Sequence, residues 1–218
     1  EKLKVPFIQE VAANALALRK KYPSVRTAIE LGGQDAKIIF FRKDEKTGDL
    51  NVADMRMNGS CAGGTGAFID EVASILKVPV EELNALAEKG GFTYDISGRC
   101  GVYAKTDIQP LLNQGASKAD VAASIYQAVV NQTITGLAQG RKIEPKVMFL
   151  GGPLYFCKGL RQRFRETLKL DDETAVFPEY GRFAVAMGAA LYGRDSGGTY
   201  TYETLREALS RDLSLIHI

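Results

Sequence analysis

Three glycine-rich turns constrain the fold of this chain more than any other feature of its sequence. Gly32-Gly33 separates two apolar segments, Gly63-Gly64-Thr65-Gly66 opens a segment with helical periodicity, and Gly151-Gly152-Pro153 joins an apolar segment to another helical one. Strands and helices joined by such turns predict an α/β fold rather than a helical bundle or a β-sandwich. Glycines also let the backbone approach a phosphate and point its N–H groups at it.

Hydrophobic periodicity predicts the order of the elements along the chain. Strands are expected at 25–31, 36–41, 50–55, 146–150 and 175–177, and the first three should form an antiparallel meander. Helices are expected at 5–21, 68–76, 80–86, 104–113, 117–140, 153–168, 182–192 and 201–213. The first helix should already be running at Phe7. Ser117 is the expected N-cap of the longest helix, with Asp120 as its acidic partner. Pro110 fits its helix only near a bend or in the first turn.

Composition and charge exclude several classes of partner. The net charge of +2 is the difference between 28 basic and 26 acidic residues, so no electrostatic field favours nucleic acid or an anionic membrane. Apolar runs such as 184–192 are shorter than the roughly 20 residues that span a bilayer, and the chain does not begin with a signal segment. An odd number of widely spaced cysteines, three in all, is typical of a reducing compartment. We therefore expect a cytoplasmic protein.

The turn at Gly32-Gly33 carries polar side chains on both sides. Glu30 stands at the end of one strand, and Gln34 and Asp35 lead into the next. A carboxylate beside a phosphate-binding turn can hold Mg²⁺, usually through water. A tight hairpin explains the same two glycines, and a plain strand–helix loop explains Gly151-Gly152-Pro153. The phosphate interpretation therefore depends on the three turns occurring together.

Two cysteines share one local context, because Cys61 stands just ahead of a helix expected to begin near Gly64 and Cys100 just ahead of one expected to begin near Val102. The positive end of a helix lowers the pKa of a thiol and favours metal ligation. An iron–sulfur cluster with four irons requires four thiolates, so a twofold dimer would complete a site to which each chain gives two. Both cysteines could instead be small buried hydrophobes. Zinc is disfavoured, because neither has a CxxC partner and the one histidine, His217, is in the tail. Cys157 lacks this context and is expected to pack in the core.

The chain resembles the ATPase activators of 2-hydroxyacyl-CoA dehydratases and the related ATPase subunits of benzoyl-CoA reductases. The motifs match in order and spacing from about residue 9 to residue 192, and Cys-Ala-small-Gly-Thr-Gly is the most specific of them. They are Glu30-Leu31-Gly32-Gly33-Gln34-Asp35-Ala36-Lys37, Asn58-Gly59-Ser60-Cys61-Ala62-Gly63-Gly64-Thr65-Gly66, Ser97-Gly98-Arg99-Cys100-Gly101-Val102-Tyr103-Ala104, Gly151-Gly152-Pro153 and Ala186-Met187-Gly188-Ala189-Ala190. Gly63 replaces the alanine usual in the short activators, and Pro153-Leu154-Tyr155-Phe156 follows Gly152. Both features are more similar to the large fused activator–dehydratase proteins.

This resemblance implies an actin-like, sugar-kinase-like ATPase fold with a ribonuclease H-like lobe, in which two lobes close on ATP and Mg²⁺. It implies a homodimer that bridges one [4Fe-4S] cluster through Cys61 and Cys100 of each subunit, or a pseudo-dimer of tandem domains in a fused protein. ATP hydrolysis would drive a low-potential electron to a dehydratase or reductase component. Glu30, Gln34 and Asp35 are then the catalytic candidates. The nucleotide-binding candidates are Gly32, Gly33, Gly63, Gly64, Thr65, Gly66, Gly151, Gly152 and Pro153.

By comparison with the family, we expect this sequence to lack most of the amino-terminal lobe with its first phosphate loop. We therefore expect residues 1–193 to be the carboxy-terminal lobe with the cluster-binding helices, and 194–218 a linker and helical tail. Such a fragment should bind nucleotide weakly and hydrolyse it poorly. Two other functions stay open from sequence alone. One is a sugar or acid kinase with structural cysteines, and the other is a non-catalytic module of a larger fused protein.

Overall fold

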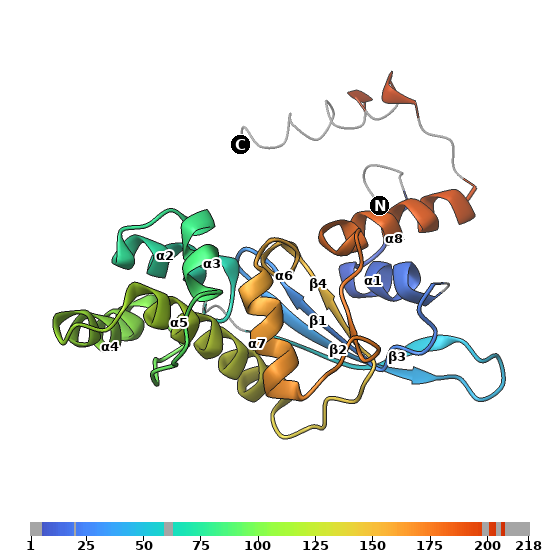
Figure 1. The fold of residues 1–218 in the computed structure, drawn as a ribbon. Helices are drawn as coiled ribbons and strands as arrows, with labels where there is room; N and C mark the ends of the chain where they lie inside the picture. Colours follow the sequence, from blue (N-terminus) through green and yellow to red (C-terminus); the bar gives the residue numbers. More distant parts are fainter. Residues whose placement is uncertain (1–5, 20, 59–62, 198–200, 204–205, 208–218) are drawn as a thin grey trace. The chain divides into compact units, whose positions relative to one another are not determined.

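The computed structural model describes residues 6–19, 21–58, 63–197, 201–203 and 206–207 (Figure 1). Two compact units are present. The larger is Ser24–Arg182, and the smaller combines Glu1–Pro23 with Phe183–Ile218. The expected division of the chain at residue 193 stays a prediction.

A five-stranded mixed sheet forms the centre of the larger unit, in the order β3-β2-β1-β4-β5. The three strands of the predicted meander pair antiparallel, whereas β4 pairs parallel with β1 and β5 pairs parallel with β4. All residues of β1 and β4 are buried, and β4 accordingly reads as a continuous apolar run, whereas β1 also buries the polar residues Thr27 and Glu30. The strands are β1 (Thr27–Leu31), β2 (Ala36–Lys43), β3 (Leu50–Met57), β4 (Val147–Leu150) and β5 (Ala175–Val176).

Helices pack against this sheet and enclose one hydrophobic core. Side chains from β1, β4, α5 and α7 meet there, including Ile29, Phe149, Val129 and Phe164. Figure 1 shows α5 and α7 beside the sheet and α2 and α4 toward one end of the unit. The helices are α2 (Gly66–Leu76), α3 (Val80–Ala87), α4 (Gly101–Asn113), α5 (Lys118–Thr133), α6 (Gly152–Phe156) and α7 (Lys158–Leu168).

The smaller unit is a pair of packed helices, α1 (Glu10–Arg19) and α8 (Ala184–Asp195). They approach closely at Gly188, because a Cβ there would lie 1.8 Å from the carbonyl oxygen of Ala13. A short 3-10 turn, Gly181–Phe183, leads into α8. The helix predicted at 201–213 lies largely outside the described residues.

The prediction that a helix is already running at Phe7 is wrong. Helix α1 begins at Glu10, and Phe7 is 79% exposed. The Gln9 side-chain oxygen accepts hydrogen bonds from the N–H groups of Val11 and Ala12, at 3.2 and 3.4 Å. Gln9 therefore supplies the partner that the first helical N–H groups need, and the apolar residues before it are not part of the stripe.

Helix α5 also ends earlier than the sequence predicts. It changes at Ile134 to a π-helix, Ile134–Ala138, rather than continuing as an α-helix to residue 140. Two threonine hydroxyls donate to carbonyls four residues earlier at this point, Thr133 to Val129 at 2.9 Å and Thr135 to Asn131 at 2.7 Å. Such hydroxyls compete with the backbone for those carbonyls, and apolar periodicity does not register that competition.

The helix predicted at 153–168 is two helices separated by a break at Cys157. The Arg161 guanidinium donates to the carbonyls of Leu154, at 2.5 Å, and Tyr155, and the N–H of Gly159 donates to the Asn84 side chain at 3.2 Å. Side chains thus satisfy backbone groups of α6 and α7 that a continuous helix would pair with each other.

Pro110 lies inside α4, which runs on to Asn113, so it is not in the first turn of its helix. The proline is near the carboxyl end of the helix, and the last turn is completed by the N–H of Gln114, which donates to the carbonyl of Pro110 at 3.0 Å. Only one intrahelical donor is lost at this position.

The N-cap predicted at Ser117 is confirmed. Its hydroxyl oxygen accepts a hydrogen bond from the N–H of Asp120 at 3.0 Å and donates to the Asp120 carboxylate at 2.7 Å. That carboxylate also accepts from the N–H groups of Gly91 and Phe92. The Ser117 hydroxyl and these N–H groups hold the pKa of Asp120 below its ordinary value. One cap therefore fixes both α5 and the loop that leads toward Cys100.

Replacing the cap tests this role. Ser117→Ala should lower the free energy of unfolding by about 1 kcal/mol, because it leaves a helix N–H without its side-chain acceptor. Ser117→Thr, which keeps the hydroxyl, should unfold close to the unsubstituted chain. Urea titration followed by circular dichroism measures both, and equal midpoints for the alanine and threonine variants would contradict the assignment.

Candidate functional site

The β1–β2 hairpin positions all three predicted catalytic side chains. Strands β1 and β2 pair so that Glu30 faces Lys37 and Leu31 faces Ala36. The N–H of Gly32 donates to the carbonyl of Asp35 at 2.8 Å and closes the turn. Gln34 therefore stands exposed at the tip, with Gly33 beside it.

A buried lysine joins the two carboxylates of this hairpin. The Lys37 Nζ atom lies 2.5 Å from Asp35 Oδ2 and 3.8 Å from Glu30 Oε2. Side-chain exposure is 3% for Lys37, 11% for Glu30 and 43% for Asp35. A buried ammonium group requires such compensation, since removing a charge from water is unfavourable unless a partner is close. Asp35 is thus the more accessible of the two hairpin carboxylates, and Glu30 is largely buried.

Sequence reasoning assigned no role to Lys37, although the signal was present. A short turn between strands places residues 30 and 37 opposite each other, and a basic and an acidic residue at such positions form a cross-strand pair. The cross-strand register, rather than the apolar periodicity, is the pattern that identifies this lysine.

The hairpin is hydrogen-bonded directly to the start of α2. The N–H of Gly66 donates to the carbonyl of Gly32 at 2.9 Å, and the N–H of Ala67 donates to the carbonyl of Gly33 at 2.6 Å. The N–H groups of these two residues at the start of α2 are therefore not open to an anion. Their hydrogen bonds connect the hairpin to the helix instead.

The third glycine turn packs against the first. Gly151 has φ +93°, and a Cβ there would lie 2.0 Å from the carbonyl oxygen of Leu31. A Cβ on Gly66 would lie 3.3 Å from Gly33 Cα and equally far from Pro153 Cγ. The three turns, which are far apart in the sequence, thus meet at one point of the larger unit.

A cavity of about 330 Å³ opens where these turns meet. Its size suits a nucleotide-like ligand, since small-molecule sites occupy roughly 300–1,000 Å³. A Cβ added to Gly33 or Gly152 would meet nothing within 4 Å, so these two glycines leave open space at the cavity wall. Sequence reasoning missed Asp70, the acidic residue of the lining. The lining consists of Gly33, Gly66, Ile69, Asp70, Val80, Gly152, Pro153, Phe156 and Cys157.

The structure brings the two predicted cysteine motifs together through their backbones. A Cβ on Gly63 would lie 2.2 Å from the carbonyl oxygen of Arg99 and 2.7 Å from that of Gly98. Only glycine fits at such an approach. Cys61 itself lies outside the described residues, so its side chain is not placed.

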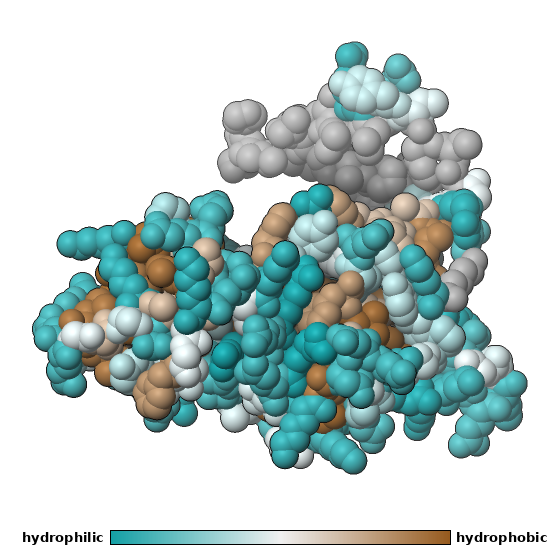
Figure 2. Space-filling model, in the orientation of Figure 1, coloured by the Kyte–Doolittle hydropathy of each residue, from teal (hydrophilic) through white to brown (hydrophobic). Residues whose placement is uncertain are grey.

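Cys100 is the N-cap residue of α4 and is partly exposed. Two apolar side chains follow it on the surface, Val102 at 65% and Tyr103 at 64% exposure. Figure 2 shows hydrophobic patches on the end of the molecule where α2 and α4 lie in Figure 1. The loop before Cys100 is held by Asp107, whose carboxylate accepts from the N–H of Ser97 at 2.8 Å.

Cys157 is in the core, as predicted, at 7% exposure. Burial raises the pKa of its thiol. It stands between α6 and α7 and also contributes to the cavity lining.

Two absences concern only the residues that the structure describes. Within them, no group of three or more histidine, cysteine, aspartate or glutamate side chains could hold a metal ion. No helix of that part combines the length and apolar character needed to cross a bilayer.

Comparison with known proteins decides the family. A family model matches residues 2–193, which is most of the chain. The chain belongs to the BadF/BadG/BcrA/BcrD ATPase family. It is 34% identical over 185 residues to the (R)-2-hydroxyglutaryl-CoA dehydratase activating ATPase of Acidaminococcus fermentans, covering 85% of this chain and 67% of that protein. It is 24% identical over 173 residues to a subunit of benzoyl-CoA reductase from Thauera aromatica, covering 78% and 59%. The predicted resemblance is confirmed.

Solved structures confirm the predicted fold class. The activator of 2-hydroxyisocaproyl-CoA dehydratase from Clostridium difficile, solved with bound ADPNP, matches with a TM-score of 0.75 and 26% identity, covering 94% of this chain and 69% of that one. A xylulose kinase from Brucella ovis matches with a TM-score of 0.57 at 14% identity, covering 94% and 51%, which shows the fold alone. Activators and sugar kinases of the actin-like ATPase fold are thus the structural neighbours of this family member.

Cysteine reactivity separates the two described thiols. In a Cys61→Ser background, iodoacetamide at pH 8 should label Cys100 well before Cys157, because Cys157 is buried and its raised pKa leaves little thiolate. Mass spectrometry of time points measures this, with labelling in denaturant as the control. Equal rates in the folded protein would contradict the placement of Cys157.

Proposed function

We propose that this chain is the nucleotide-binding and cluster-binding part of an ATP-dependent activator, which delivers a low-potential electron to a 2-hydroxyacyl-CoA dehydratase or a related CoA-ester reductase. The observation that carries the proposal is the meeting of three glycine turns at one cavity in a chain of this ATPase family. The activating role of the relatives supports the dehydratase partner.

The cavity fits the phosphates of ATP. Gly33 and Gly152 leave backbone at its wall with space where side chains would project, which is the arrangement that lets phosphate oxygens approach closely. Ile69 and Val80 provide an apolar wall of the kind that binds a base or ribose. The structural relative with bound ADPNP supports nucleotide as the ligand.

The hairpin carboxylates suit the metal and water of phosphoryl transfer. Mg²⁺ prefers carboxylate oxygens together with its own waters. Asp70 is exposed and lines the cavity, and Asp35 is partly exposed in the neighbouring hairpin turn. Lys37 holds Asp35 in place and offsets charge repulsion by a polyphosphate. Glu30, which lies 3.8 Å from the Lys37 ammonium group, and Gln34, at the hairpin tip, would orient the attacking water.

A cluster shared between two copies fits what surrounds Cys100. The residue is partly exposed at the start of a helix, and Val102 and Tyr103 beside it present apolar surface that a second copy would cover. Gly63 brings the Cys61 motif against the residue before Cys100. We therefore infer that Cys61 and Cys100 of each subunit hold one [4Fe-4S] cluster in a homodimer. When bound, such a cluster supplies a one-electron carrier of low potential.

The hydrogen bonds between the hairpin and α2 would couple the two sites. A shift of Gly32 and Gly33 on nucleotide binding acts on the N–H groups of Gly66 and Ala67, and so on the helix that follows the Cys61 motif. Coupling requires such an element with two arrangements that both sites bias.

Two glycine substitutions test the nucleotide site. Gly33→Ala and Gly152→Ala should weaken nucleotide binding about tenfold or more, because the added methyl group projects into the cavity while meeting no protein atom within 4 Å. Gly91→Ala is the matched control, since its Cβ also meets nothing within 4 Å and Gly91 lies away from the cavity. Fluorescence titration with a labelled, non-hydrolysable ATP analogue measures the three variants. Equal affinities would contradict the site.

Anaerobic iron and sulfide analysis tests the cluster. The chain should contain four irons per dimer, and Cys61→Ser or Cys100→Ser should lose most of the iron, because each removes two of the four ligands. Cys157→Ala should keep the iron, since this thiol is in the core. Sedimentation of the same samples gives the mass of the particle. Iron retained in both serine variants would overturn the cluster and leave the nucleotide site untouched.

A further inference from the structure

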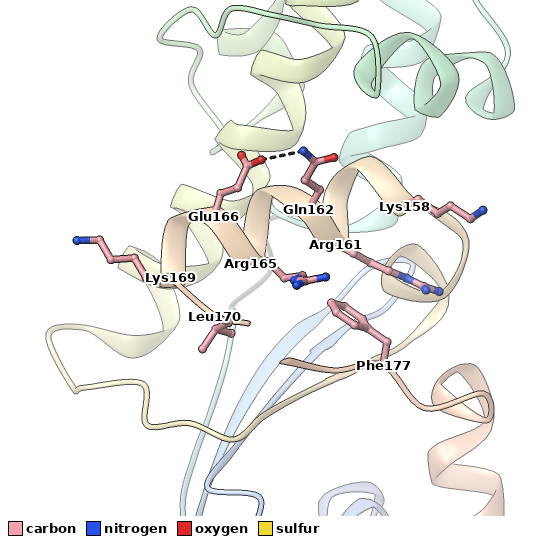
Figure 3. Close-up of a pocket in the computed structure, with 8 residues that line it drawn as sticks. All are labelled: Lys158, Arg161, Gln162, Arg165, Glu166, Lys169, Leu170 and Phe177. Atoms are coloured by element: carbon pink, nitrogen blue, oxygen red, sulfur yellow. Dashed lines mark hydrogen bonds between the residues drawn. The ribbon is translucent and has the colours of Figure 1, made fainter. Parts of the chain in front are cut away.

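One face of α7 carries a line of basic side chains that the proposed function does not use. Lys158, Arg161, Arg165 and Lys169 line a groove of about 640 Å³ together with Gln162 and one acid, Glu166, and Leu170 and Phe177 provide its apolar part (Figure 3). Spacings of three and four residues place Lys158, Arg161 and Arg165 on one side of the helix, and Lys169 follows as its C-cap residue. The opposite side, with Leu160 and Phe164, is buried in the core.

The cations of this groove are only partly compensated within the chain. Arg165 pairs with the highly exposed Asp172 at 2.7 Å. Glu166, which also lines the groove, is engaged by Gln162 at 2.8 Å and by Arg163 at 3.2 Å. Figure 3 shows Glu166 and Gln162 joined on the side of α7 away from Phe177. In the part of the chain that the structure describes, Lys158 and Lys169 form no ion pair.

Arg161 is fixed in the groove without a carboxylate. Its guanidinium donates to the carbonyls of Leu154 and Tyr155 and lies 5.2 Å from the centre of the Phe177 ring. Burial lowers the pKa of this guanidinium. Among the described residues no acid pairs with it, so the groove holds an ordered positive charge that an anion would stabilise.

Charge and length together indicate the class of ligand. Residues 158–169 contain five basic side chains and one acid, a net charge of +4, whereas the whole chain carries +2. The line of cations from Lys158 to Lys169 extends about 16 Å at 1.5 Å per helical residue. One phosphate group cannot contact both ends, whereas about five residues of an extended peptide span that length.

We propose that the α7 groove binds an acidic peptide segment of a partner protein, through carboxylates that contact the line of cations from Lys158 to Lys169. The site is separate from the glycine-lined cavity, so it adds a docking surface to a protein whose nucleotide chemistry takes place elsewhere. Carboxylates of the peptide would meet the guanidinium and ammonium groups, and Phe177 and Leu170 would contact its apolar atoms.

A labelled peptide tests this proposal on the full 218-residue chain. Fluorescence anisotropy would follow a ten-residue peptide of alternating Glu and Ser at low salt, with a Gln and Ser peptide as the uncharged probe. The acidic peptide should bind, and the uncharged one should not. Lys158→Gln combined with Lys169→Gln should weaken binding about fivefold, because two exposed charges at the ends of the line are lost. Both side chains are exposed, so the fold should be retained.

The matched control removes two lysines elsewhere. Lys46→Gln combined with Lys89→Gln makes the same change in charge at exposed positions outside the groove and should leave the affinity unchanged. If both double variants weakened peptide binding equally, the binding would arise from the net charge of the whole protein rather than from the groove, and the proposal would be overturned. Displacement of the peptide by inorganic pyrophosphate at matched charge concentration, or no binding of the acidic peptide at low salt, would overturn it as well.

Discussion

Two hydrogen bonds between the β1–β2 turn and the first residues of α2 are the contact on which the rest of the site depends. The carbonyls of Gly32 and Gly33 point at Gly66 and Ala67, so the turn cannot move without acting on the helix. The same approach leaves no room for side chains, because Gly66 lies against Gly33 and Pro153, and Gly151 lies against Leu31. The glycines therefore serve first to let three backbone segments meet, and the cavity follows from that meeting.

Much of this arrangement could be predicted from local patterns. Buried strands, a capped helix at Ser117 and glycine turns at strand ends depend on neighbouring residues, so periodicity and turn chemistry reveal them. The motifs identified the family for the same reason. Local patterns do not reveal which turns come together, because β1 and β4 pair across more than a hundred residues of sequence. The shared cavity is therefore a result of the sheet order.

Three errors in the predicted helix boundaries have one physical cause, which is that side chains replaced backbone partners. Gln9 caps α1 two residues after Phe7, threonine hydroxyls accompany the π-helix, and Arg161 takes the carbonyls at the end of α6. Each such change of hydrogen-bond partner alters where a helix begins or ends, but it leaves the apolar periodicity of the sequence unchanged. Lys37 was missed differently, because its role arises from the cross-strand register rather than from its neighbours.

Arg161 contacts elements of both the glycine-lined cavity and the α7 groove. Its hydrogen bonds to Leu154 and Tyr155 separate α6 from α7, and α6 begins at Gly152 on the wall of the glycine-lined cavity. The same guanidinium faces Phe177 in the α7 groove. A ligand that bound the Arg161 guanidinium would therefore compete with the carbonyls of α6 for its N–H groups. The geometry of α6 in turn determines the position of Pro153 against Gly66. The groove and the cavity thus share one structural element, and the energy of coupling between them is limited by the few hydrogen bonds of that side chain.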